Sequence, residues 1–147
     1  MKVYNPDFKS RVEKYLQRQE FMKHIGFNLD VIEAGRTEGK LTLEKKHLQQ
    51  KGYAHGGLVA TLADITAGFA AYTLVPDDHN VVTGEIKVSY FQPGIGQELH
   101  VKGWVIKPGR KINFCEAEVW CTNHDRKTLI AKATASMVTI FPEDTKR

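Results

Sequence analysis

The segment from Gln49 to Asp64 holds the residues whose types and spacing could do chemistry. Its His55-Gly56-Gly57 triplet lies where the sequence pattern changes from loop to helix. The amino end of a helix presents unpaired backbone N–H groups, and glycine lets a ligand oxygen approach them closely. This arrangement could stabilise the oxyanion that forms during acyl transfer. The two glycines are equally compatible with a tight turn that has no chemical role.

Asp64 is the only charged residue between His55 and Asp77, and it falls two turns into a segment of apolar and small residues. An unpaired carboxylate is costly to bury, so this one must be hydrogen-bonded, protonated or open to a wet cleft. A carboxylate in a cleft can act as a general base or as a nucleophile. The structural alternative is a carboxylate hydrogen-bonded within the core or pointing out through a gap in the sheet.

Helix geometry limits how Gly56 and Asp64 could work together. Their separation of eight residues corresponds to roughly 12 Å of helical rise. A reacting carbon must lie about 3 Å from both the attacking group and the oxyanion donors, so a single helix cannot supply both. If both groups act, they come from different subunits, and the predicted site lies at a dimer interface.

Hydrophobic periodicity predicts one long helix that carries these residues. An apolar residue recurs every three or four positions over residues 56–75, and small residues occupy the other faces. A helix that is apolar or small on nearly every side is expected to be buried. We also expect a shorter amphipathic helix near the N-terminus, with Asn5 as its cap and Pro6 at its first helical position.

The rest of the chain is predicted to form strands that surround the long helix. Alternating apolar residues and turn signals predict strands over residues 25–31, 36–43, 81–91, 99–106, 111–121 and 129–140. The first two should form a hairpin and the last four an antiparallel meander. The predicted fold class is α+β, with an antiparallel sheet wrapped around one long central helix.

Length and composition indicate one globular domain. The chain has 147 residues, of which 41% are hydrophobic and 26% charged. We expect residues 1–147 to form a single domain in which residues 1–22 are an N-terminal helical segment. The net charge of +4 favours an anionic ligand, but the sequence lacks the dense basic stripe of a nucleic-acid-binding protein.

Cysteine usage and hydropathy predict a cytoplasmic protein. Cys115 and Cys121 are six residues apart on one predicted strand, or roughly 20 Å, which is too far for a disulfide. Free thiols suit a reducing compartment. We find no signal-peptide-like or membrane-spanning apolar run, and no spacing of Cys and His typical of a metal site.

The segment from Phe21 to Ile140 resembles the hotdog-fold acyl-CoA thioesterases, in the branch of His-Gly-Gly type that includes the phenylacetate-pathway and 4-hydroxybenzoyl-CoA thioesterases. The resemblance rests on the lead-in from Phe21 to Gly35, on His-Gly-Gly followed by Ala-Thr-Leu-Ala-Asp, and on Thr-Gly-Glu-Ile-Lys-Val-Ser-Tyr-Phe-Gln-Pro from Thr83. It implies a hotdog fold and a hydrolase that releases a free acid and coenzyme A. Coenzyme A would be part of the substrate, with no separate cofactor and no metal.

The resemblance also implies a role for each matching position. The backbone amide of Gly56 would polarise the thioester carbonyl, and His55 would shape and hydrogen-bond that loop. Gln49 matches a position near the substrate carbonyl or the attacking water. Asp64 matches the catalytic carboxylate, and Thr83 a hydroxyl that positions the carboxylate or the water.

Three further residues are candidates for substrate binding. Gly57 adjoins the predicted oxyanion amide, and Arg110 and Lys111 belong to a basic loop that could meet the phosphates of coenzyme A. A solvated hairpin turn explains the basic loop equally well. Four aromatic residues could line an acyl pocket or belong to the core: Phe69, Tyr72, Tyr90 and Phe91.

The sequence therefore predicts a homo-oligomeric acyl-CoA thioesterase, dimeric at least, with a tetramer built as a dimer of dimers as the larger assembly. Its expected partner is the acyl-CoA substrate, and no nucleic acid or membrane is expected. One alternative is a hydratase or dehydratase that acts on acyl thioesters on the same fold. A second alternative is a non-catalytic module that binds or senses acyl-CoA. The acyl group preferred is not readable from the sequence.

Overall fold

The computed structural model describes residues 1–146 and contains one antiparallel sheet of six strands packed on the long helix α3. The strands are β1 (Asn28–Glu33), β2 (Arg36–Thr42), β3 (Asn80–Tyr90), β4 (Glu98–Lys107), β5 (Ile112–Asn123) and β6 (Arg126–Ile140). Helix α3 spans Gly56–Tyr72 and packs against all six strands. This arrangement confirms the predicted α+β architecture.

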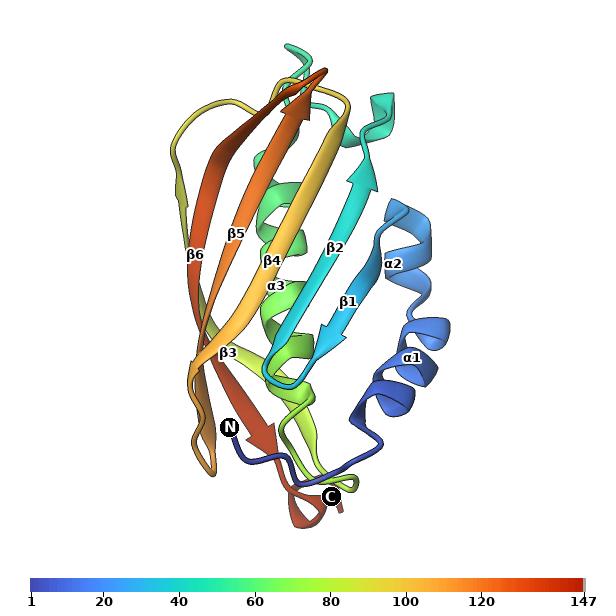
Figure 1. The fold of residues 1–147 in the computed structure, drawn as a ribbon, viewed down its shortest axis with the longest axis vertical. Coiled ribbons are helices and arrows are strands. Elements are labelled where there is room, and N and C mark those ends of the chain that lie inside the picture. The colour runs from blue at the N-terminus through green and yellow to red at the C-terminus, as the bar shows by residue number, and fades with distance from the viewer. Residues whose placement is uncertain (147) are drawn as a thin grey trace.

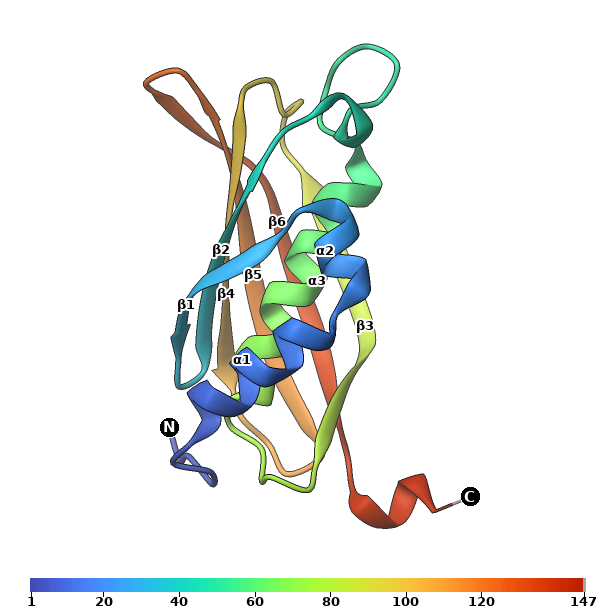
Figure 2. The same ribbon diagram turned by 90° about the vertical axis from the view of Figure 1, so that its right-hand side faces the viewer.

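The strand order β1-β2-β4-β5-β6-β3 corrects the predicted meander. Strands β4, β5 and β6 are consecutive neighbours as expected, but β3 pairs with β6 at the far edge, and β2 takes the place beside β4. The sheet curls, so β2 and β3 end up on opposite flanks of α3 (Figures 1 and 2). Closing both flanks around one helix buries more apolar surface than a meander lying on one side of it would.

The N-terminal segment forms two helices rather than one. Helix α1 spans Phe8–Arg18 and α2 spans Glu20–Ile25, where a strand was predicted to begin at residue 25. Gly26 adopts a left-handed conformation with φ of 77° and ends α2. Asn5 is not the cap of α1: Asp7 precedes the first helical residue, and the Asn5 side chain accepts the Asp7 N–H at 2.8 Å.

Arg11 ties α1 to the carboxyl end of α3. Its Nη1 donates to the carbonyl oxygens of Val75 at 3.1 Å and Pro76 at 2.9 Å, and its Nε donates to the Tyr72 hydroxyl at 2.7 Å. Helices α1 and α2 therefore lie across the side of α3 that the sheet leaves uncovered (Figure 2). The helix ends at Tyr72, three residues earlier than predicted, although the residues that follow are still buried.

The Thr73 side chain explains that earlier end. Its hydroxyl accepts the Gly35 N–H at 2.7 Å and donates to the Ala70 carbonyl at 2.6 Å. The turn between β1 and β2 is therefore joined to the last turn of α3, and the chain leaves the helix there. This connection lies between residues 38 positions apart, so local periodicity could not have indicated it.

Both cysteines are buried in β5 and neither forms a disulfide, as the sequence predicts. Burial raises the pKa of the Cys115 thiol to about 12. Between residues 1 and 146 there is no helix with the length and apolar character needed to cross a membrane.

Gly103 of β4 allows a close approach between the sheet and α3. A Cβ atom there would lie 2.7 Å from both the Ala67 nitrogen and the Thr66 carbonyl carbon, which belong to the helix backbone. Thr37 reinforces the contact from β2, since its hydroxyl donates to the Thr66 carbonyl at 2.7 Å. A larger residue at position 103 would therefore push the helix away from the sheet.

We predict that Gly103→Ala lowers the free energy of unfolding by about 1–3 kcal/mol, the usual cost of overpacking a core. The matched control is Gly68→Ala on α3, where an added Cβ would be 3.9 Å from the nearest atom, the Met137 sulfur. That change should be neutral or stabilising by up to about 1 kcal/mol, because alanine favours helix over glycine. Urea unfolding at one protein concentration measures both. Equal stabilities for the two variants would contradict the close approach.

Candidate active site

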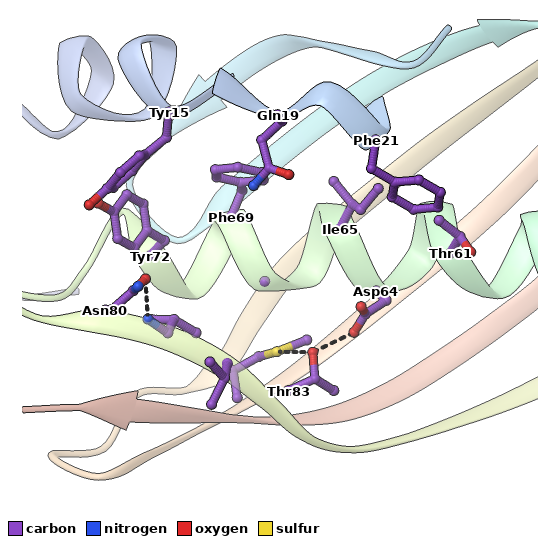
Figure 3. Close-up of a pocket in the computed structure, with 14 residues that line it drawn as sticks. Tyr15, Gln19, Phe21, Thr61, Asp64, Ile65, Phe69, Tyr72, Asn80 and Thr83 are labelled. Atoms are coloured by element: carbon purple, nitrogen blue, oxygen red, sulfur yellow. Dashed lines mark hydrogen bonds between the residues drawn. The ribbon is translucent and has the colours of Figure 1, made fainter. Parts of the chain in front are cut away.

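Asp64 is hydrogen-bonded to Thr83, and together they form one half of the candidate site. Asp64 lies on the side of α3 that faces β3, and the Thr83 hydroxyl donates to its Oδ1 at 2.6 Å (Figure 3). Gly84 is an extra residue in the pairing of β3 with β6, which shifts register between Thr83 and Glu85. A bulge of this kind reorients neighbouring side chains. Asp64 is therefore partly buried and hydrogen-bonded to Thr83, rather than fully buried in the core.

An open groove of about 450 Å³ runs along α3 from Asp64 toward Tyr72. Helices α1 and α2 border it on one side and β3 borders it on the other (Figure 3). The Tyr15 and Tyr72 rings lie 5.0 Å apart at the end remote from Asp64, and Phe69 meets Tyr72 edge to face at 6.2 Å. The groove is therefore aromatic at one end and carries a carboxylate at the other.

The amino end of α3 forms the second half of the site. His55 is the N-cap, and its Nδ1 accepts the Gly57 N–H at 2.9 Å. In the neutral imidazole this leaves the proton on Nε2. The Gly56 N–H has no hydrogen-bond partner among residues 1–146. It is therefore a free backbone donor at the positive end of a helix, the feature expected of an oxyanion site.

The backbone conformation does not explain why glycine occupies positions 56 and 57. Neither has a positive φ, unlike Gly26, Gly35 and Gly52. At position 57 a Cβ would lie 3.1 Å from the His55 Nδ1 and would crowd the cap. At position 56 a Cβ would meet only the Tyr90 ring at 3.6 Å, which is ordinary contact. Within residues 1–146, neither a positive φ nor a close contact to an added Cβ accounts for glycine at position 56.

Gln49 and Tyr90 join Gly56 around a second groove of about 340 Å³. Gln49 sits in a turn in which its N–H donates to the Tyr53 carbonyl at 2.9 Å and its side chain accepts the Lys51 N–H. The Tyr90 hydroxyl donates to the Gly56 carbonyl at 2.6 Å. From the sequence, Tyr90 was expected to line an acyl pocket or belong to the core, and its contact with the start of α3 was not predicted.

The structure thus brings the predicted residues together in two groups that line different grooves. Asp64 and Thr83 form one group, and Gln49, Gly56 and Tyr90 form the other. His55 and Gly57 border a third, smaller hollow beside α2. The two groups are on one molecule but do not share a groove, as the rise of the helix between residues 56 and 64 requires.

The basic loop lies at the opposite end of α3 from Gly56. Arg110 and Lys111 fall in the turn between β4 and β5, near the two chain ends (Figure 1). The Arg110 guanidinium stacks 5.0 Å from the centre of the Phe141 ring and borders a cavity of about 440 Å³ with Lys2 and His79. Lys111 is exposed. Over residues 1–146 there is no cluster of His, Cys, Asp and Glu that could hold a metal ion.

The chain is similar to known proteins in sequence and in fold. A sequence model described as the thioesterase superfamily matches residues 51–127, which include Gly56, Asp64 and Thr83. The crystal structure of a thioesterase family protein from Silicibacter pomeroyi matches with a TM-score of 0.89 and 28% identity, over 91% of this chain and 98% of that one. This likeness confirms the hotdog fold.

Two further proteins extend the comparison. The E. coli PaaI protein from the phenylacetic acid degradation operon has the same fold, with a TM-score of 0.81 at 16% identity over 93% of this chain and 96% of that one. The 1,4-dihydroxy-2-naphthoyl-CoA thioesterase 2 of Arabidopsis thaliana is 26% identical over 125 residues, which are 82% of this chain and 77% of that protein.

We predict that His55→Ala destabilises the protein by about 1 kcal/mol, because the Gly57 N–H loses its side-chain acceptor. His55→Asn should recover most of that loss, since asparagine is among the best N-cap residues. Urea unfolding of the three proteins measures both effects. If the alanine variant is as stable as the original protein, the cap contributes nothing and the contact between His55 and Gly57 is incidental.

Proposed function

Because the chain belongs to the thioesterase superfamily, we propose that it hydrolyses acyl-CoA thioesters to a free acid and coenzyme A, at a site shared between two copies of the chain. The observation that carries the proposal is the division of the site. Asp64, which is held by Thr83, and Gly56, whose N–H has no partner among residues 1–146, line separate grooves of one molecule.

Strand β3 supports dimerisation. It lies at the edge of the sheet, where it pairs only with β6 among the described strands, and most of its residues are at least partly exposed. An edge strand of 11 residues with unpaired backbone groups is a template for a second strand. We infer that β3 pairs with β3 of a second copy, in antiparallel orientation.

That pairing would bring the two half-sites together. Thr83, which holds Asp64, and Tyr90, which holds Gly56, both belong to β3 and lie seven residues apart. A two-fold axis near the middle of this interval sets Thr83 of one copy beside Tyr90 of the other. Each Asp64 then faces the Gly56 N–H of the partner molecule, and the dimer contains two equal sites.

In the proposed reaction the thioester carbonyl oxygen accepts the free Gly56 N–H, which stabilises the negative charge that develops on it. Asp64 of the other copy either takes a proton from the attacking water or attacks the carbonyl carbon itself. In the first case hydroxide adds to the carbonyl carbon, the carbon–sulfur bond breaks, and the departing thiolate takes up the proton that Asp64 removed from water. In the second case the carbon–sulfur bond breaks to leave an anhydride between Asp64 and the acyl group, the thiolate takes a proton from solvent, and a water molecule then hydrolyses the anhydride to the free acid. Gln49, which lines the Gly56 groove, would orient the carbonyl or the water, and Thr83 would hold the Asp64 carboxylate in position.

Two regions of the molecule are candidates for holding the acyl and coenzyme A portions of the substrate. The acyl group would occupy the groove along α3, toward Phe69 and Tyr72. Arg110 and Lys111 lie in the turn between β4 and β5, and Arg110 shares a cavity with Leu74 and Pro76, beyond the carboxyl end of α3. These two cations could bind the phosphates of coenzyme A.

We predict that Asp64→Asn lowers the rate of thioester hydrolysis by at least about 100-fold, the usual contribution of a general base. The amide can still accept the Thr83 hydrogen bond, so the fold should be retained. Thiol release from short-chain, long-chain and aryl acyl-CoAs measures the rate and the preferred acyl group together. Asp125→Asn, an exposed aspartate in the β5–β6 turn, is the matched control and should keep full activity.

Two outcomes would contradict the proposal. Full activity of Asp64→Asn would remove the carboxylate from the mechanism. Binding of acyl-CoA without turnover of any substrate by the original protein would instead identify a non-catalytic binding module.

A further inference from the structure

Tyr90 reaches Gly56, whose backbone N–H has no hydrogen-bond partner among residues 1–146. It is the last residue of β3, and its hydroxyl donates to the Gly56 carbonyl at 2.6 Å across a separation of 34 residues. Its ring carbons lie 3.6 Å from the point at which a Cβ of Gly56 would stand. The side chain thus covers Gly56 on one side and binds its carbonyl.

This hydrogen bond is not needed to satisfy a buried polar group. Tyr90 is 53% exposed, so its hydroxyl could be hydrated by solvent instead. The Gly56 carbonyl stands in the first turn of α3, where it can accept the N–H of the residue four positions later. Burial of part of the ring raises the pKa of the Tyr90 hydroxyl, so this group remains a donor at neutral pH.

Because position 56 is a glycine, its backbone requires an additional restraint, which this hydrogen bond supplies. Glycine is the most conformationally free residue, and an oxyanion donor is effective only when its direction is set before the reaction. The cap between His55 and Gly57 restrains the chain on both sides of Gly56. The Tyr90 hydroxyl restrains Gly56 itself, through the carbonyl of the same residue that carries the free N–H.

We propose that Tyr90 is a positioning residue for thioester hydrolysis, which holds the Gly56 backbone so that its N–H points at the developing oxyanion. This inference rests on the proposed function. It also gives β3 two tasks, because the same strand holds the carboxylate through Thr83 and the oxyanion donor through Tyr90. Two side chains of one strand would thereby orient both reacting groups.

Tyr90→Phe tests the proposal because it removes only the hydroxyl and keeps the ring against Gly56. We expect kcat to fall by roughly 5- to 10-fold, the size of one neutral hydrogen bond, with KM changed by less than about 2-fold. Tyr4→Phe, an exposed tyrosine at the other end of the molecule, is the matched control and should leave kcat unchanged. Thermal unfolding should show that both variants remain folded.

A readout independent of turnover separates this proposal from the proposed function. In two-dimensional amide NMR spectra, Tyr90→Phe should shift or broaden the Gly56 and Gly57 resonances, whereas Tyr4→Phe should leave them in place. Unchanged kcat together with unchanged Gly56 and Gly57 resonances would overturn the role of Tyr90, even if Asp64→Asn is inactive. A parallel fall in both kcat and affinity for substrate would indicate a binding role and would also overturn it.

Discussion

The rise of the α-helix is the constraint on which the rest of the structure depends. The donor at Gly56 and the carboxylate at Asp64 are separated by roughly 12 Å along the axis of α3, too far to meet at one carbonyl carbon. Within one chain they line separate grooves. If both groups act on one substrate, two copies of this helix must contribute to each site, and one flank of α3 has to stay open to a second molecule.

The sheet meets this requirement by curling around α3 while leaving β3 at its edge. Gly103 lets the helix lie directly on β4, and Thr37 links β2 to the same turn of the helix. This packing fixes α3 against the centre of the sheet. β3 can then hold the Asp64 carboxylate with Thr83 and the Gly56 carbonyl with Tyr90, while its outer edge remains available to a partner strand.

Features with a strong local pattern could be predicted from the sequence. The start of α3 at Gly56 and the six strands follow from periodicity, because burial against one face imposes it. The place of β3 beside β6 could not be predicted, since strand order depends on contacts between distant residues. Two helix ends also differ from the prediction. Gly26 ends α2 in a left-handed conformation, and the Thr73 hydroxyl, next to the end of α3, forms a hydrogen bond with a residue distant in the sequence. The contact of Tyr90 with Gly56 escaped prediction because an aromatic residue near a strand end also suits a core.

The shared site is tested most directly by mixing two inactive variants. Gly56→Pro removes the free N–H at the first helical position, where proline is well tolerated, and Asp64→Asn removes the carboxylate. Each homodimer should be inactive. After subunit exchange, shown by recovery of differently tagged heterodimers, our account predicts that hydrolysis returns, because one of the two sites in each heterodimer combines an intact Gly56 with an intact Asp64. Heterodimers that form and remain inactive would contradict it.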